Sequence, residues 1–402
     1  MMFKKWIASC FALTLYLGLI PEAWAAETVT LWHSYRSRER AAFESAVANF
    51  NAKGGVQVEL SYVPYDAFPD KITAAIPRGK GPDLFIFAHD RVGDWAVSEF
   101  IEPLDFWLTD EMRDAFLPPT MDALTYDDSV YGLPMSFKMV ALIYNKKMVS
   151  TPPKTTGELI SVAKRNTVPA QKKYGLVYEN ANFYYQGAWL QGFGGRVFSK
   201  SGKPMLSSPQ AVASMSFAQD LARNQGIMPK EVSSVLVTTL FNSGQAAMII
   251  DGPWAIGSIK KGVDYAVAPL PVIEATGKPA TPFLTSEGLI MNANSEKKKA
   301  AFDVMTHLTG PEAGKVMAKQ GRQTVANKSV YADPSIGNDP VLKVFRTQLR
   351  NSRPMPNTPA MKMVWDPATT AMNKVINGGA DPSAAMSEAQ TKLEALVKSA
   401  RR

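Results

Sequence analysis

The chain has 402 residues, of which 46% are hydrophobic, and its 44 Lys and Arg against 36 Asp and Glu give a formal net charge of +8. A chain of this size and composition can bury two ordinary hydrophobic cores. Basic residues are scattered, and the Lys297-Lys298-Lys299 run is typical of a solvated helix face, so we expect no nucleic acid partner.

The N-terminus has the features of an export signal. Two lysines precede an apolar stretch and the small-residue site Ala23-Trp24-Ala25, so we expect residues 1–25 to be a signal peptide and the mature protein to be periplasmic. The segment up to Cys10 superficially resembles a lipoprotein box, but most of the apolar stretch follows the cysteine instead of preceding it. Because Cys10 is the only cysteine, disulfides, thiol nucleophiles and cysteine metal clusters are excluded from the mature chain.

The first part of the mature chain alternates between strand and helix patterns. "TVTLW" (28–32) and "VQVELSYV" (56–63) predict strands on either side of a segment with apolar residues at helical spacing. A helix is predicted around 67–78, and the apolar run "DLFIF" (83–87) predicts a strand buried on both faces. This alternation indicates an α/β fold, in which ligands bind beyond the carboxyl ends of strands.

Further strands are predicted at 141–145, 246–250 and 265–270. Thr155 and Glu158 form a capping-box pattern at the start of a helix, and Ser208-Pro209 is expected to begin another that stops at Gly226. Beyond residue 295 we expect mostly helix, apart from a connection around 334–359.

Motifs for catalysis or cofactor binding are scarce. "GFGGRV" (192–197) lacks the third glycine of a dinucleotide fingerprint, and "GPEAGKV" (310–316) has the wrong spacing for a phosphate loop. His33, His89 and His307 are far apart without metal-ligand spacing, so we interpret them as surface or hydrogen-bonded core histidines. We therefore predict no cofactor, no metal site and no catalytic residues.

Aromatic residues stand beside planar polar groups where strands end. The four clusters are Phe87/Asp90/Arg91/Trp95, Asn182/Phe183/Tyr184/Tyr185/Trp189, Asp251/Trp254 and Trp365/Asp366. A pyranose ring presents C–H groups to an aromatic face, and its vicinal hydroxyls suit carboxylate, amide and guanidinium groups. Taken one at a time, such residues are as often core aromatics or surface ion pairs, but four clusters together favour sugar binding.

Four ordered motifs resemble the maltose/maltodextrin-binding proteins of bacterial ABC importers. They are "GPDLFIFAHDR" (81–91), "LIYNKKM" followed by "PPKT" (142–155), "AAMIIDGPWA" (246–255) and "MPNTPAM" leading to Trp365. The resemblance implies a two-lobed α/β periplasmic binding protein fold with a hinge and a ligand in the interlobe cleft. It places residues 26–137 and 288–336 in the first lobe, and 138–287 and 337–402 in the second.

The resemblance also implies the ligand-binding residues. Asp90 and Arg91 match the family's hydroxyl-binding pair, and Phe87 stands where the family has a tryptophan. Three further positions match stacking aromatics of the family, namely Tyr184, Trp254 and Trp365.

Several acids of the family are missing. The position of the family's acidic residue after the first strand is Arg36 in this chain, with Glu39 nearby. The family's cleft glutamate corresponds to Lys138, and a second glutamate corresponds to Asn182. A tyrosine of the family corresponds to Asp366. A buried ammonium needs a partner, so Lys138 either pairs with a protein acid such as Glu287 or Asp366, or awaits an anionic ligand. We favour the first arrangement, because the remaining motifs follow the neutral-sugar pattern.

The leading hypothesis is a monomeric periplasmic protein that binds an oligosaccharide, most simply maltose or a maltodextrin, and delivers it to the membrane permease of an ABC importer. One alternative keeps this role but changes the ligand to a different or anionic oligosaccharide. A remote alternative is a secreted carbohydrate-active enzyme.

Overall fold

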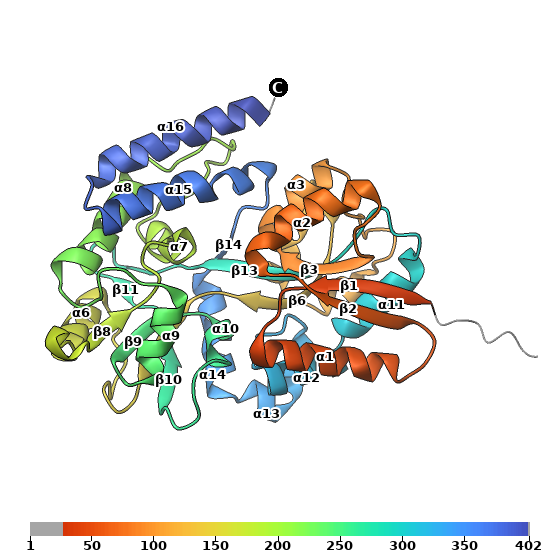
Figure 1. Cartoon of the computed structure of the whole chain (residues 1–402), viewed down its shortest axis with the longest axis horizontal. Helices are drawn as coiled ribbons and strands as arrows, with labels where there is room; N and C mark the ends of the chain where they lie inside the picture. Colours follow the sequence, from red (N-terminus) through yellow and green to blue (C-terminus); the bar gives the residue numbers. More distant parts are fainter. Residues whose placement is uncertain (1–26, 401–402) are drawn as a thin grey trace, which may run out of the picture.

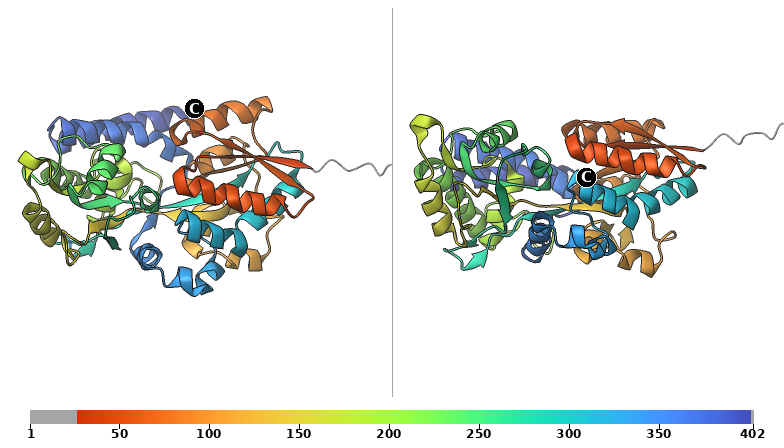
Figure 2. Two further views of the ribbon diagram at one scale, coloured as in Figure 1. Left: turned by 60° about the horizontal axis from the view of Figure 1, so that its bottom comes forward. Right: turned by 90° about the horizontal axis from the view of Figure 1, so that it is seen from below.

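The computed structural model describes residues 27–400, so the expected signal peptide and Cys10 lie outside the described residues. Two bodies, each built around its own sheet, lie side by side, and the segments that carry β6, β13 and β14 run between them (Figures 1 and 2). Within residues 27–400 we find no helix with the length and apolar character needed to cross a membrane.

The larger sheet has six strands, in the order β14-β13-β3-β1-β2 with β6 paired to β13. The strands are β1 (Thr28–His33), β2 (Gln57–Tyr62), β3 (Leu84–Ala88), β6 (Leu133–Lys138), β13 (Phe283–Met291) and β14 (Arg353–Pro354). β1 runs parallel to β2 and β3, whereas β13 is antiparallel to β3 and β6. The strands predicted from "TVTLW", "VQVELSYV" and "DLFIF" are confirmed.

Both faces of this sheet are covered by helices, which explains the continuous apolar run in β3. Leu84 and Ile86 point into a core shared with α1 (Ser37–Asn51), α11 (Lys298–Leu308) and α12 (Pro311–Gly321). Phe85 and Phe87 point to the opposite face, where α2 (Phe68–Ala75) and α3 (Val92–Val97) close a second core. Successive side chains of β3 therefore point alternately into the two cores.

The smaller sheet has the order β10-β7-β9-β8. Its strands are β7 (Ala141–Asn145), β8 (Tyr174–Val177), β9 (Ala246–Asp251) and β10 (Tyr265–Ala268), as the sequence predicts for three of them. One face packs on α6 (Thr156–Arg165), α7 (Phe183–Gly192), α8 (Pro209–Gln219), α15 (Trp365–Met372) and α16 (Pro382–Ala400). The other packs on α9 (Ser234–Asn242), α10 (Pro253–Ile256) and α14 (Pro340–Gln348). The exact lobe boundaries stay a prediction.

The remaining elements are short: α4 (Asp110–Asp114), α5 (Pro118–Ala123), β4 (Thr125–Tyr126), β5 (Ser129–Val130), β11 (Val272–Ile273), β12 (Lys278–Pro279) and α13 (Pro334–Gly337).

Two local predictions need correction. The Thr155 hydroxyl caps α6 by accepting from Glu158 N–H, but Glu158 accepts from Lys154 N–H and not from Thr155, so the capping box is only half formed. The predicted connection at 334–359 contains α13 and α14. Each begins with a proline at its first position behind an aspartate cap, Asp333 or Asp339, whose carboxylate accepts backbone N–H groups.

Candidate functional site

Asp90 and Trp365 bring the two bodies into contact. β3 ends at Ala88 and continues into the 3-10 turn η3 (His89–Arg91), which holds Asp90 in a buried position. The indole Nε1 of Trp365, the first residue of α15, donates to Asp90 Oδ2 over 3.1 Å. A second bridge lies nearby, where Lys362 Nζ is 2.5 Å from Asp94 Oδ1. Residues about 275 positions apart thus meet at the carboxyl end of β3.

A buried histidine fixes the turn that carries Asp90. The ring of His89 is fully buried, and its Nδ1 accepts a hydrogen bond from Ser286 N–H over 3.0 Å. Nε2 therefore carries the hydrogen and donates to Met355 O, 2.9 Å away. Burial lowers the pKa of His89 to about 4, so the ring is neutral. The interpretation of His89 as a hydrogen-bonded core histidine is confirmed.

Burial dominates the electrostatics of Asp90. It raises the pKa of the Asp90 carboxyl to about 6, although the Arg91 guanidinium and the Trp365 hydrogen bond both lower it. Arg91 Nε lies 3.7 Å from Asp90 Oδ2 and makes no hydrogen bond within the described residues. This Nε is buried, but the Arg91 side chain as a whole is 21% exposed. The pair combines a carboxylate and a guanidinium, the two group types that bind vicinal hydroxyls.

The second body contributes two aromatic rings, Tyr184 on α7 and Trp254 on α10. Their centroids are 6.0 Å apart at an interplanar angle of 60°. The Tyr184 hydroxyl lies 3.0 Å from Thr285 Oγ1 and 3.2 Å from Lys138 O, which fixes the ring against the strands between the bodies. The Trp254 ring lies over Gly252, where an added Cβ would come within 2.2 Å of its carbons. Glycine at 252 is what allows the tryptophan this position.

Asp251, at the end of β9, supports the Trp254 turn. Its carboxylate accepts from Gly252 N–H over 2.8 Å and from the Tyr185 hydroxyl over 3.2 Å. Burial raises the pKa of the Asp251 carboxyl to about 7, although these hydrogen bonds lower it.

Lys138 at the end of β6 lies in a buried ion cluster. Its Nζ is 2.9 Å from Glu287 Oε1 and 3.1 Å from Glu39 Oε1, and it stands 5.3 Å from the centroid of the Tyr35 ring. The other Glu287 oxygen accepts from Ser136 Oγ over 2.7 Å and from the Tyr35 hydroxyl over 3.3 Å. Burial lowers the pKa of Lys138, but the two carboxylates more than offset this and raise it. The preferred arrangement, in which Lys138 pairs with Glu287, is confirmed.

Phe87 has no uncovered ring face. It lies between the ring of Tyr65, at 4.9 Å and 22°, and the ring of Phe68, at 5.1 Å and 23°, and its side chain is buried. The sequence places Phe87 at the strand end but does not show that α2 and the turn before it fold over this face of the sheet. The structure puts Phe87 in the core, behind Tyr65.

Three other predicted residues have structural surroundings of their own. Asn182 caps α7 by accepting from Tyr184 N–H over 3.0 Å. Arg36 is exposed at the N-cap of α1, with no side-chain capping bond. Asp366 is exposed and pairs with Lys392 of α16, so the structure does not bring it to Lys138.

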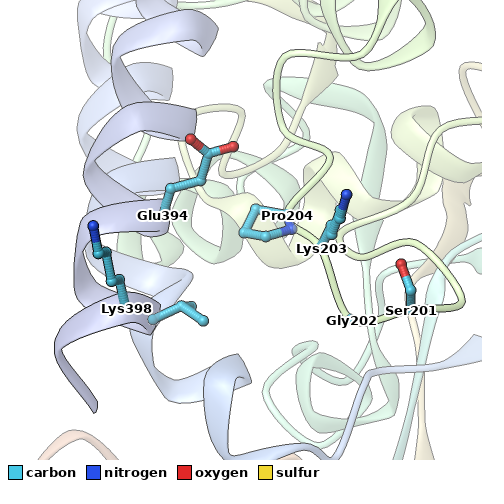
Figure 3. A pocket seen from close by; sticks show the side chains of 7 residues that line it. Ser201, Gly202, Lys203, Pro204, Glu394 and Lys398 are labelled. Atoms are coloured by element: carbon cyan, nitrogen blue, oxygen red, sulfur yellow. The ribbon is translucent and has the colours of Figure 1, made fainter. Parts of the chain in front are cut away.

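Sequence reasoning missed Tyr65, which lies in the 3-10 turn η1 (Tyr65–Ala67) and is 45% exposed. The only signal was an aromatic residue between a predicted strand and the next helix, in "SYVPYDAF". A surface pocket of about 430 Å³ does not involve the predicted residues. It lies between the 201–204 loop and α16, and Lys203, Glu394 and Lys398 are among its lining residues (Figure 3).

Two α/β lobes with polar and aromatic side chains from both at their contact are the architecture of a binding protein that encloses its ligand between lobes. The sequence pattern of the family described as "Bacterial extracellular solute-binding protein" matches residues 36–315, and the chain belongs to this family.

Similar proteins cover most of the chain. The maltotriose-binding protein of Pyrococcus abyssi is 34% identical over 90% of this chain and 79% of its own length. A maltooligosaccharide ABC transporter solute-binding lipoprotein of Streptococcus pneumoniae is 26% identical, over 88% of this chain and 86% of that one. The maltose/maltodextrin-binding domain of MalE from Bdellovibrio bacteriovorus, solved with maltotriose, superimposes with a TM-score of 0.86 at 27% identity, over 92% of this chain and 100% of that one.

Proposed function

We propose that the protein captures a neutral oligosaccharide of the maltodextrin type between its lobes, without chemical change, and delivers it to the permease of an ABC importer. The observation that carries the proposal is the meeting of Asp90 in the first lobe with Trp365 in the second, beside the guanidinium of Arg91. The pairing of planar hydroxyl-binding groups with aromatic rings suits a pyranose. We further propose that the mature protein is a periplasmic monomer whose signal peptide is removed.

The surroundings of Lys138 support a neutral ligand. The two carboxylates within 3.1 Å satisfy its charge inside the protein, so no anionic group on the ligand is needed. An acidic oligosaccharide would instead have to compete with Glu39 and Glu287 for the ammonium. Asn182 caps a helix and Arg36 is exposed, so neither side chain needs an anionic group on the ligand.

Maltotriose affinity should weaken by about ten-fold between pH 7.5 and pH 5. The pKa of Asp90 is about 6, so its carboxylate is mostly ionised at the higher pH and mostly protonated at the lower. Protonation removes acceptor capacity from the group that would accept the sugar hydroxyls, and one pH unit below the pKa leaves about a tenth of it ionised. Calorimetric titration at the two pH values measures the change.

Two variants identify the responsible group. Asp90→Asn should bind more weakly at pH 7.5 and lose the pH dependence. Asp251→Asn should keep it, although the pKa of Asp251 is also raised. Chromatography of the sugar recovered after each titration should return intact maltotriose. Shortened products would favour the enzyme alternative, and an unchanged affinity at pH 5 would contradict the role of Asp90.

A further inference from the structure

We propose that Tyr65, and not Phe87, presents the first lobe's aromatic face to the sugar. The inference rests on the proposed function and specifies which ring of the first lobe contacts the ligand. The resemblance to the family points to Phe87, because Phe87 stands where the family has a tryptophan. The packing around that position points to a different residue.

Three rings stack behind the candidate site. Phe68 of α2 and Tyr65 of η1 both stack on Phe87, with interplanar angles of 23° and 22°. Trp95 of α3 closes the edge of the same ring, 5.6 Å between centroids. A sugar can therefore reach Phe87 only if Tyr65 leaves, and leaving would expose the buried face of both rings to water.

Tyr65 has the exposure that Phe87 lacks. Phe87 is 4% exposed, whereas Tyr65 is 45% exposed. One face of Tyr65 is taken by Phe87, so the accessible area belongs to the opposite face and the ring edges. Tyr65 is thus the outermost ring of the stack, and the one that a ligand meets first.

Tyr65 lies near enough to Asp90, Arg91 and Tyr184 to be affected by their charges. Burial among the surrounding groups raises the pKa of Tyr65 well above its usual value, and Asp90, Glu287 and Tyr184 raise it further, whereas Arg91 lowers it. Asp90 and Arg91 belong to the first lobe, and Tyr184 comes from α7 in the second. The hydroxyl is therefore neutral, and a neutral phenol can both donate to and accept from a sugar hydroxyl.

The stack behind Tyr65 also explains how a residue in a short turn can serve as a rigid platform. Phe87 is fixed by the register of β3, and Phe68 by the first turn of α2. Their close packing restricts the side-chain rotation of Tyr65 before any ligand arrives, so little conformational entropy is lost on binding.

The test is maltotriose affinity, measured by calorimetry, together with thermal stability. Tyr65→Ala should weaken binding by about five- to fifty-fold, as expected for the loss of one stacked ring. Tyr65→Phe keeps the ring and should stay within about three-fold of wild type. Phe87→Leu removes a buried ring and should lower the melting temperature, with a smaller loss of affinity than Tyr65→Ala.

The control is Tyr62→Ala. Tyr62 is 40% exposed, lies three residues before Tyr65 and makes an edge contact with His33, away from Phe87. Its replacement should leave affinity unchanged. The inference is overturned if wild type and Tyr65→Ala bind maltotriose equally, or if Phe87→Leu loses binding more than Tyr65→Ala. Absence of binding by wild type would reject the proposed function itself, and the inference with it.

Discussion

Replacing Lys138 by methionine is expected to lower the free energy of unfolding by about 3 to 5 kcal/mol. Lys138 stands between Glu39 and Glu287, both within 3.1 Å, and its side chain is 9% exposed. Methionine fills most of the volume but leaves two carboxylates facing each other without a cation. Urea denaturation followed by circular dichroism measures the loss.

Lys146→Met is the matched control. Lys146 pairs with Asp264 over a similar distance, 3.1 Å, but both side chains are about half exposed, so this change should cost less than about 1 kcal/mol. The double variant Lys138→Met/Glu287→Gln removes one of the stranded charges and should recover part of the stability. Lys138→Met could instead be as stable as Lys146→Met and yet fail to bind sugar. In that case the ammonium serves the ligand, and the proposed role of Lys138 as the partner of Glu39 and Glu287 is wrong.

Replacing Trp254 by alanine is expected to weaken sugar binding by about 1 to 3 kcal/mol, or about five- to 150-fold. The ring is half-buried, sits over Gly252 and meets Tyr184 at an angle, so part of its surface is available to a ligand. A sugar stacked there would lose apolar burial and ring contact. Calorimetry gives the affinity and thermal denaturation the stability.

Trp189→Ala separates stacking from core packing. Trp189 is fully buried in the same lobe and donates from Nε1 to the Tyr178 hydroxyl over 3.2 Å. Its removal should cost about 3 to 5 kcal/mol of stability and leave the affinity of the folded protein little changed. A Trp254→Ala variant that behaves like Trp189→Ala, with a large melting loss and unaltered affinity, would place Trp254 in the core.

The strands were predictable because their signals are local. β3 and β9 are apolar runs ended by polar residues, and the alternating pattern of 56–63 sets the faces of β2. The helices at 334–348 were missed, although Asp333-Pro334 and Asp339-Pro340 carry the cap and first-turn proline that start a helix. In this segment Pro and Asn were interpreted as loop residues, although proline at the first helical position favours a helix.

The sequence predicted the candidate site only for residues whose role depends on their own position in the chain. Asp90 follows β3 directly, and any fold that buries this strand places it at the strand end. The state of Phe87 depends instead on how Tyr65 and Phe68, about 20 residues earlier, fold over it. Lys138 was expected to need an acid, and Glu287 was one of two candidates. Glu39 was noted as a nearby acid, but the sequence did not show that it would join the cluster, because α1 approaches β6 only in the folded chain.

The ligand proposed for this protein is a neutral maltodextrin. Isothermal titration calorimetry of the mature chain with maltotriose, and in parallel with a uronic-acid oligosaccharide, tests it most directly. Maltotriose should show saturable one-site binding that changes little between low and high salt, and the acidic sugar should show no comparable binding. Tight, salt-sensitive binding of the acidic sugar with no heat from maltotriose would contradict it.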